Sequence, residues 1–342
     1  MAYKKSKGKQ RMSKIEPSVL TMTIATPDTA GGRYYIDLSQ CASLLNRRFY
    51  RQGVNWAVAG IKVISSKAGT LSVGKLPNTW VMSNSWEKGF RSWIRMNNEA
   101  TSEAESIRPR FLDFKVYADD QHHSLGSSAN LLPVSFTGSK ALPGDWDYST
   151  FEIPVSNADP TLPAGNSVTR DVVAVGPNYT APGASGNYAV SLIEGYAASR
   201  ALPNVRDPNM PDDASSASGS TAQNWQVALF NEGTDQDSQV LQDLETQNNI
   251  APYPFENDGA NPDTMYPGGA NQLVGMEWHD IVTLYESNTT NGVGSQRVKG
   301  GNFPCGLIAI DWTPDTASNV VLQIDLIPGS HRGYLCEPMT EM

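Results

Sequence analysis

The chain has 342 residues and a formal net charge of −9, from 26 Lys and Arg residues against 35 Asp and Glu residues. This length allows one large β domain or two ordinary ones. No apolar run approaches the roughly 20 residues that span a bilayer, and no apolar segment follows the basic N-terminus, so neither a membrane anchor nor a secretory signal is expected. The three cysteines are too few and too widely spaced for a disulfide framework, which favours a reducing compartment.

Charge is divided unevenly along the chain. Residues 1–115 hold 19 of the Lys and Arg residues and 8 of the Asp and Glu residues, whereas residues 116–342 hold 7 and 27. This division predicts two surfaces that face different environments. The positive sign of the first part predicts a polyanionic partner.

The basic charge is densest at the N-terminus. Residues 1–16 lack apolar periodicity and are predicted to form a disordered arm ahead of a folded domain over 17–342. Flexible lysines neutralise phosphates without reading bases, so the arm is the first candidate for nucleic-acid binding. Its basic residues are Lys4, Lys5, Lys7, Lys9, Arg11 and Lys14.

Strands are the main elements expected in the folded domain. Apolar residues alternate with polar ones over 18–25 and 110–117, and an apolar run rich in β-branched residues covers 54–64, so we expect a strand in each range. Further short strands are predicted near 150–155, 170–175, 188–197, 225–230 and 273–285.

Helices are expected at two places. Residues 85–97 place apolar side chains on one face and charged ones on the other, as in an amphipathic helix. Asn84 is the expected N-cap, and Glu87 stands three residues later to complete a capping box. A second helix is predicted over 38–48.

The last strong pattern predicts a hairpin between strands over 307–312 and 320–327. Polar stretches over 203–224 and 251–271 are read as long exposed loops. With 29 Gly and 22 Pro residues between many short strands, the sequence predicts an all-β fold. The expected architecture is a single eight-stranded jelly-roll β-sandwich with long loops and one or two short helices.

Two patterns resemble binding sites for nucleotide or metal, and both are read as structural. Residues 69–76 nearly match a phosphate-binding loop, but Leu76 stands where that motif needs a hydroxyl, so a strand and turn are expected. Asp119, Asp120, His122 and His123 form an acidic and imidazole cluster. Neighbouring strand residues point to opposite faces, so we expect a solvated loop rather than a metal site. The sequence predicts no catalytic site, no metal and no cofactor.

A second basic group follows the helix over 38–48. Arg47, Arg48 and Arg51 stand beside Phe49 and Tyr50. Arginines next to aromatic rings can bind the phosphates and stack on the bases of single-stranded nucleic acid. The alternative interpretation is a helix end with solvated arginines.

Three segments resemble the coat proteins of small circular single-stranded DNA viruses that encode a rolling-circle replication protein. They are the arm over 4–14, GTLSVGKLPNTWVMSNSWEKGFRSWIRMN at 69–97 and IPGSHRGYLCEPM at 327–339. The resemblance implies a jelly roll assembled into an icosahedral shell, with 60 copies as the simplest closed solution. It further implies an arm that faces inward and binds the single-stranded DNA genome without sequence preference.

This resemblance also implies a structural role without enzymatic activity. The protein would reside in the virion, and the basic arm suggests the host nucleus during assembly. The chain departs from many members of the family in its short, lysine-based arm and in its greater length. The sequence does not identify a host receptor.

Two other functions are compatible with the predicted fold. A carbohydrate-binding or carbohydrate-cleaving β-sandwich shares the architecture but does not need the basic arm. A monomeric single-strand-binding protein would be expected to be basic overall. Fold alone does not separate these classes, whereas particle size would.

Overall fold

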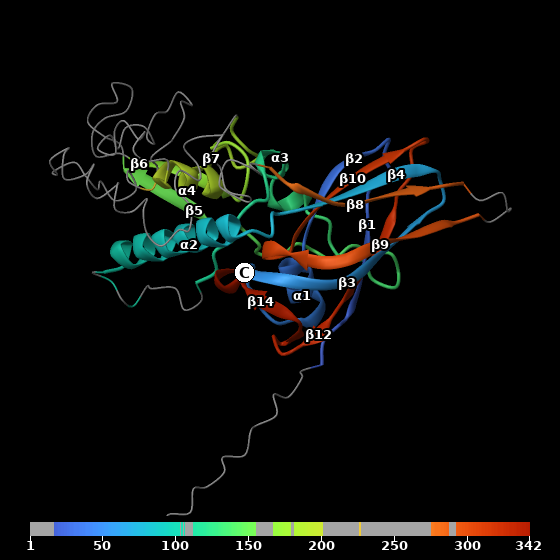
Figure 1. The fold of residues 1–342 in the computed structure, drawn as a ribbon, viewed down its shortest axis with the longest axis horizontal. Coiled ribbons are helices and arrows are strands. Elements are labelled where there is room, and N and C mark those ends of the chain that lie inside the picture. Colours follow the sequence, from blue (N-terminus) through green and yellow to red (C-terminus); the bar gives the residue numbers. More distant parts are fainter. Residues whose placement is uncertain are drawn as a thin grey trace, which may run out of the picture.

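The computed structural model describes residues 17–102, 104, 106, 112–154, 167–178, 181–200, 226, 275–286 and 292–342. The arm over 1–16 and the loops predicted over 203–224 and 251–271 lie outside the described residues. The strand predicted near 225–230 also lies outside them, apart from Gln226. Figure 1 shows a β-sandwich built from the first and last strands, beside a smaller group of helices and short strands from the middle of the chain.

Two curled antiparallel sheets form the sandwich (Figure 1). The first contains β1 (Thr21–Ala25), β3 (Val54–Ser65), β9 (Gly294–Phe303), β11 (Val321–Leu326) and β14 (Cys336–Pro338). Its order is β1-β11-β3-β14, with β9 also paired to β3. The second contains β2 (Gly32–Asp37), β4 (Gly69–Lys75), β8 (Glu277–Leu284) and β10 (Leu307–Pro314), in the order β2-β10-β4-β8.

Alternating side chains fill the space between the two sheets. Met22 and Ile24 of β1 are fully buried, as the alternation predicted, whereas Leu20 precedes the strand and is 38% exposed. Trp56 of β3 and Trp312 of β10 are among the largest buried side chains of this core. Burying one such side chain stabilises the fold by about 2 kcal/mol, so the core holds the two sheets together.

The predicted hairpin over 307–312 and 320–327 is wrong. Both strands exist, but β10 pairs with β2 and β4 in one sheet, and β11 pairs with β1 and β3 in the other. The connecting loop therefore crosses the sandwich, and Trp312 Nε1 donates a hydrogen bond of 3.0 Å to the carbonyl of Ser318 within it. Alternation defines which face of a strand is buried and does not define its partner.

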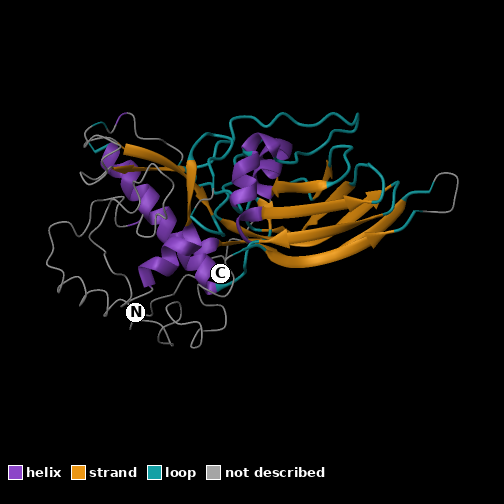
Figure 2. Ribbon diagram, turned by 90° about the horizontal axis from the view of Figure 1, so that it is seen from above, coloured by secondary structure: helices purple, strands orange, loops and turns teal. Residues whose placement is uncertain are grey.

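The smaller part of the molecule lies in the chain between β4 and β8. Its elements are α2 (Trp80–Ala100), α3 (Asp120–Leu125), β5 (Thr150–Pro154), β6 (Ser167–Val173), β7 (Tyr188–Ser191) and α4 (Leu192–Arg200). In the view from above, the longest helical ribbons lie to one side of the sandwich, whereas another helix lies against its strands (Figure 2). Helices α2 and α4 approach closely, because a Cβ on Gly89 would lie 2.4 Å from Leu192 Cδ2. A second apolar core, which includes Trp86 and Phe114, holds this part together.

The described residues contain four α-helices, more than the one or two that the sequence predicted. Helix α1 (Leu38–Asn46) matches the helix expected over 38–48. The capping box expected at Asn84 is wrong, because α2 begins at Trp80 and its N-cap is Thr79, whose side chain accepts a hydrogen bond from the Met82 amide. Buried Val81 fixes this first turn against the core, so packing extends the helix beyond its amphipathic stretch.

Two strand predictions in the middle of the chain need correction. The segment near 188–197 is a strand only as far as Ser191, where α4 follows directly. Of the strand expected over 110–117, residues 112–116 form no strand, and Tyr117 makes a single bridge to Val173. None of the described helices is long and apolar enough to span a membrane.

Short elements complete the described chain. They are the 3-10 turns Ser127–Ala129, Pro304–Gly306 and Met339–Glu341, and the two-residue strands β12 (Pro328–Gly329) and β13 (Gly333–Tyr334). Strands β12 and β13 pair with each other to form a tight hairpin. This hairpin carries part of the candidate site.

Candidate nucleic-acid interface

The predicted basic-aromatic group lies where α1 ends. Arg47 is the C-cap of α1 and adopts a left-handed conformation with a φ of 53°, which turns the chain away from the helix axis. Arg47, Arg48 and Arg51 are all exposed, as both interpretations of the sequence required. The two rings differ, because Phe49 is 39% exposed whereas Tyr50 is buried in the sandwich core. Phe49 is therefore the ring of this pair available for stacking.

The N-terminal arm joins the folded domain beside this group. Pro17 is the first described residue, and its carbonyl accepts a hydrogen bond of 3.4 Å from Arg48 Nη1. Two residues later, the Val19 amide donates a 3.0 Å hydrogen bond to Asn46 Oδ1 at the end of α1. The Val19 carbonyl accepts a 2.6 Å hydrogen bond from the Tyr334 hydroxyl. These contacts fix the attachment point of the arm next to the arginines, although the arm residues Lys4–Lys14 themselves lie outside the described chain.

The β12–β13 hairpin adds a cation that the sequence analysis missed. Arg332, with a φ of 50°, stands at its tip before Gly333 and is exposed. Its Nη1 donates a hydrogen bond to the main-chain carbonyl of Phe49, and its own carbonyl accepts a 3.0 Å hydrogen bond from the Tyr50 hydroxyl. The HRG turn in the sequence was a usable signal for an exposed arginine. Its position beside Phe49, 283 residues away, was not readable from the sequence.

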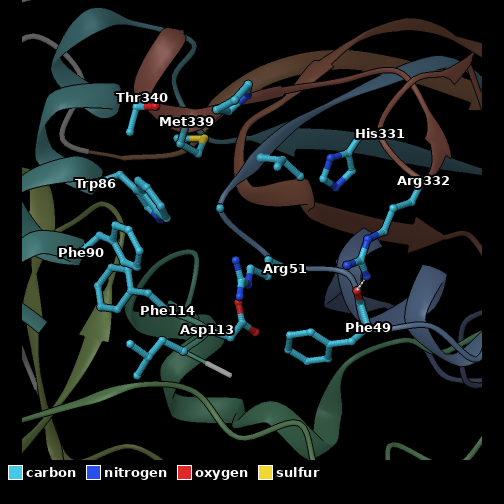
Figure 3. Close-up of a pocket in the computed structure, with 14 residues that line it drawn as sticks. Phe49, Arg51, Trp86, Phe90, Asp113, Phe114, His331, Arg332, Met339 and Thr340 are labelled. Atoms are coloured by element: carbon cyan, nitrogen blue, oxygen red, sulfur yellow. Dashed lines mark hydrogen bonds between the residues drawn. The ribbon is translucent and has the colours of Figure 1, made fainter. Parts of the chain in front are cut away.

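Three of these residues, Phe49, Arg51 and Arg332, border a pocket of about 400 Å³ between the sandwich and α2 (Figure 3), whereas Arg47 and Arg48 do not line it. Arg51, Arg332 and Phe49 lie on the sandwich side, and Trp86 and Phe90 project from α2. The remaining lining residues are Gly53, Val54, Leu112, Asp113, Phe114, His331, Pro338, Met339 and Thr340. The pocket thus combines aromatic rings with cations, the combination that binds single-stranded nucleic acid.

The aromatic wall of the pocket is tightly packed. The rings of Trp86 and Phe90 stack with their centroids 5.0 Å apart and their planes 22° from parallel. Phe114 meets the Trp86 ring edge-on at 6.0 Å. Gly53 makes room for the indole, because a Cβ there would lie 2.5 Å from Trp86 Cζ2. The wall is therefore held in place by neighbours on both sides and does not depend on a ligand.

One acid and one imidazole also line the pocket. Burial raises the pKa of Asp113, while Lys115, whose Nζ lies 3.5 Å from Asp113 Oδ2, and Arg51 act in the opposite direction. Burial, and secondarily the charge of Arg332, lowers the pKa of His331, so this imidazole is neutral at pH 7. The exposed arginines therefore carry the pocket's positive charge.

A second basic surface lies on the outer face of the first sheet. Ile61 and Val298 point into the core, and Lys62, Arg297 and Lys299 alternate with them and are exposed. Arg297 of β9 reaches across β3 to Asp325 of β11, with Nη2 and Oδ2 3.6 Å apart. This basic surface lies outside the lining of the pocket.

Residues 69–75, which nearly match a phosphate-binding loop, form strand β4 and pair with β8 and β10. Lys75 Nζ is directed to the Asn302 carbonyl at 3.4 Å. A strand that is paired on both sides offers no cradle of main-chain N–H groups for a phosphate.

The solvated loop expected at Asp119–His123 is wrong. These residues form the N-cap and first turns of α3, and both His122 and His123 are buried. Asp119 caps the helix and accepts a hydrogen bond from the buried Tyr35 of β2. Among the residues that the structure describes, no three His, Cys, Asp or Glu side chains are grouped to hold a metal ion.

Hydrogen bonds define the protonation state of His122. Its Nδ1 accepts a 3.0 Å hydrogen bond from the Ala118 amide, so the Nε2 hydrogen is donated to Asn130 Oδ1 at 2.7 Å. Burial lowers the pKa of His122 to about 4. The ring stacks on Tyr35 of the sandwich at 4.3 Å, so a neutral imidazole joins the two parts of the molecule.

Other residues considered in the sequence are structural. His279 contacts the Lys299 carbonyl at 2.9 Å, and its ring packs edge-on against Phe303. Cys41 and Cys305 are buried, Cys336 is half-buried, and all three thiols are free.

Comparison of the chain with known proteins gives no match to a family model, to a curated protein or to a solved structure.

Proposed function

We propose that this chain is the coat protein of a small circular single-stranded DNA virus, which assembles many copies into a closed shell around its genome. The proposed role is structural rather than enzymatic. It places the protein in the virion, with the host nucleus as the site of assembly.

The strand pairing supports the jelly roll that this proposal requires. β1 pairs with β11, β2 with β10, β3 with β9 and β4 with β8. The first of these eight strands therefore pairs with the last, the second with the second to last, and so on inward. A nested set of pairs that wraps into two facing sheets is the connectivity of a jelly roll, a fold used by viral capsid and lectin domains.

The observation that carries the proposal is the attachment of the basic arm beside the arginines. Pro17 contacts Arg48, and Arg51 and Arg332 lie on the same region of the surface, around the pocket. Cations far apart in the sequence therefore meet where the arm leaves the folded domain. A coat protein needs this arrangement, because its shell must present one positive surface to the genome.

The proposal is tested by the size and contents of the purified full-length protein. Light scattering and negative-stain microscopy should reveal closed, roughly spherical particles of many copies, with 60 as the simplest number. Nuclease-protected single-stranded DNA should be recovered from them. A monodisperse monomer or dimer across pH and salt concentration would contradict the proposal.

One observation favours the second candidate, a carbohydrate-binding sandwich. A pocket of about 360 Å³ on the second sheet is lined by Trp278, which is 73% exposed, and by carboxylates that include Asp120, Glu277 and Asp311. A flat ring beside carboxylates can bind a sugar. Calorimetry with oligosaccharides checks this function, with Trp278→Ala expected to abolish binding. Tyr285→Ala is the matched control, because this exposed ring does not line the pocket.

A further inference from the structure

The wall of the basic-aromatic pocket contains a buried donor without an acceptor. Trp86 is 4% exposed, and its Nε1 donor has no hydrogen-bond partner. Asp113 differs, because its Oδ2 forms an ion pair with Lys115 Nζ at 3.5 Å. Leaving a buried donor unsatisfied is unfavourable, so the Trp86 donor in a pocket wall indicates a ligand that accepts a hydrogen bond from it.

The shape of the pocket limits the class of that ligand. A volume of about 400 Å³ falls within the range of small-molecule sites, about 300–1,000 Å³. Phe90 and Phe114 flank Trp86 on the apolar wall, where a flat aromatic group can pack. The Trp86 Nε1 donor in the same wall suits the edge of a nucleobase, since every base presents hydrogen-bond acceptors there.

The cations lie on the opposite side of the pocket from the α2 rings (Figure 3). Arg51 and Arg332 are exposed, and each guanidinium carries five N–H donors. Arg332 uses Nη1 to contact the Phe49 carbonyl, which holds the side chain at the pocket. Planar guanidinium groups bind phosphate through paired hydrogen bonds, so this side of the pocket suits an anion.

We propose that this pocket binds one nucleotide unit. The base packs against Phe90 and accepts a hydrogen bond from Trp86 Nε1, while the phosphate lies on Arg51 and Arg332. This inference rests on the proposed function, because the exposed Arg48 directly precedes Phe49, which lines the pocket. The same chemistry would bind a free nucleoside monophosphate, and the experiment below separates the two sources.

The test uses the full-length protein and deoxyadenosine 5′-monophosphate as the probe, with deoxyadenosine and inorganic phosphate as part-ligands. Calorimetry should give saturable binding of the nucleotide, about tenfold tighter than that of deoxyadenosine, because charge-assisted hydrogen bonds from the arginines to the phosphate add affinity. Inorganic phosphate alone should bind weakly. Equal binding of nucleotide and nucleoside would overturn the assignment of the phosphate to the arginines.

The variants separate the two ends of the pocket. Arg332→Gln should weaken nucleotide binding about tenfold and leave deoxyadenosine binding unchanged. Trp86→Phe, which removes the donor, should weaken both. Because Trp86 also packs in the core, its thermal unfolding is measured alongside, and Arg332→Gln is decisive if that variant does not fold. Arg297→Gln is the matched control: it removes the same charge from a strand outside the pocket and should change neither affinity.

Competition identifies the source of the nucleotide. A twelve-residue deoxyadenosine oligonucleotide should displace the bound nucleotide if the pocket holds a base of a strand. Failure to displace it would overturn the role of the pocket in genome binding and leave a site for free nucleotides. If the nucleotide does not bind at all while purified particles contain DNA, the pocket inference fails and the proposed function stands. If the nucleotide binds but the purified protein forms no particles, the pocket assignment stands and the proposed function fails.

Discussion

The Arg48 guanidinium donates a hydrogen bond of 3.4 Å to the main-chain carbonyl of Pro17, 31 positions earlier in the sequence. The contact joins the start of the folded domain to the segment that follows α1. As a result, the arm joins the folded domain beside Arg48. The first two predictions test whether nucleic acid binds to the arm and to Arg47, Arg48 and Arg51.

Deletion of residues 1–14 should lower the packaged nucleic acid without unfolding the domain. The deleted segment carries six basic residues, whereas the two described apolar cores begin at Met22. The absorbance ratio at 260 and 280 nm of purified particles measures the packaged DNA, and circular dichroism checks the fold. If truncated particles contain as much DNA as the full-length protein, the arm does not hold the genome.

Replacing Arg47, Arg48 and Arg51 by Gln should weaken binding of single-stranded DNA and make it less dependent on salt. Each phosphate contact contributes a slope of about −0.7 to log affinity against log salt, so the triple variant should lose about 2 from the slope. Fluorescence anisotropy of a labelled oligonucleotide measures both quantities. Arg91→Gln, on another surface, should leave the slope nearly unchanged, and an equal loss per removed charge in this control would show that only net charge matters.

His122 should make the protein sensitive to acid. Its folded pKa of about 4 lies below the ordinary value of 6.5, so the unfolded chain binds a proton first as the pH falls. Stability is therefore complete above about pH 6.5 and declines towards pH 4, by up to about 3 kcal/mol, since one pKa unit corresponds to about 1.36 kcal/mol.

His122→Gln tests this origin of the acid sensitivity. The variant should be less stable than the wild type at pH 8, because Gln does not reproduce both ring hydrogen bonds. Its stability should then change less between pH 6.5 and pH 4. Urea unfolding at several pH values measures the difference, and parallel curves for the two proteins would rule out His122 as the source.

Asp37 is the most heavily hydrogen-bonded buried acid in the described chain. It caps α1 by accepting from the Ser39 and Gln40 amides, and it accepts side-chain hydrogen bonds from Gln52 and Trp146. Asp37→Asn replaces one acceptor oxygen by a donor that faces other donors. We expect a loss of about 1–3 kcal/mol in the free energy of unfolding. Denaturant unfolding at pH 7 measures this loss.

A control variant at an exposed acid and the pH dependence of stability both test the prediction for Asp37→Asn. Asp28→Asn, at an exposed position, should change stability by less than about 0.5 kcal/mol.

Burial raises the pKa of Asp37 from 3.8 to about 6, so the folded protein binds this proton first and gains stability as the pH falls through that window. Asp37→Asn lacks this compensation and should lose stability more steeply in acid. A shallower acid profile would contradict the sign.

Local patterns in the sequence were sufficient for many single elements. The alternation that buries Leu322 and Ile324 gave the inner face of β11, and the helix over 38–48 was expected close to its observed bounds. The exposure of Arg47, Arg48 and Arg51 also followed from the sequence. These properties depend on neighbours within a few residues, where period and capping chemistry act.

Properties that depend on residues far away in the chain could not be predicted from local patterns in the sequence. The sequence placed His122 and His123 in a solvated loop, because nothing nearby indicated that Tyr35 and Asp171 would cover them. The hairpin prediction failed for the same reason, since β10 had better partners far away in the chain.

The sequence by itself determined that this protein is rich in strands, has a basic N-terminus and carries a cluster of arginines beside aromatic residues. Only the tertiary structure decided that Arg332 contacts Phe49, that the Trp86 donor in the same pocket lacks an acceptor, and that Pro17, where the described chain begins, contacts Arg48. The physical reason is that pairing and packing energies between residues hundreds of positions apart select one arrangement among many that satisfy the local pattern equally well.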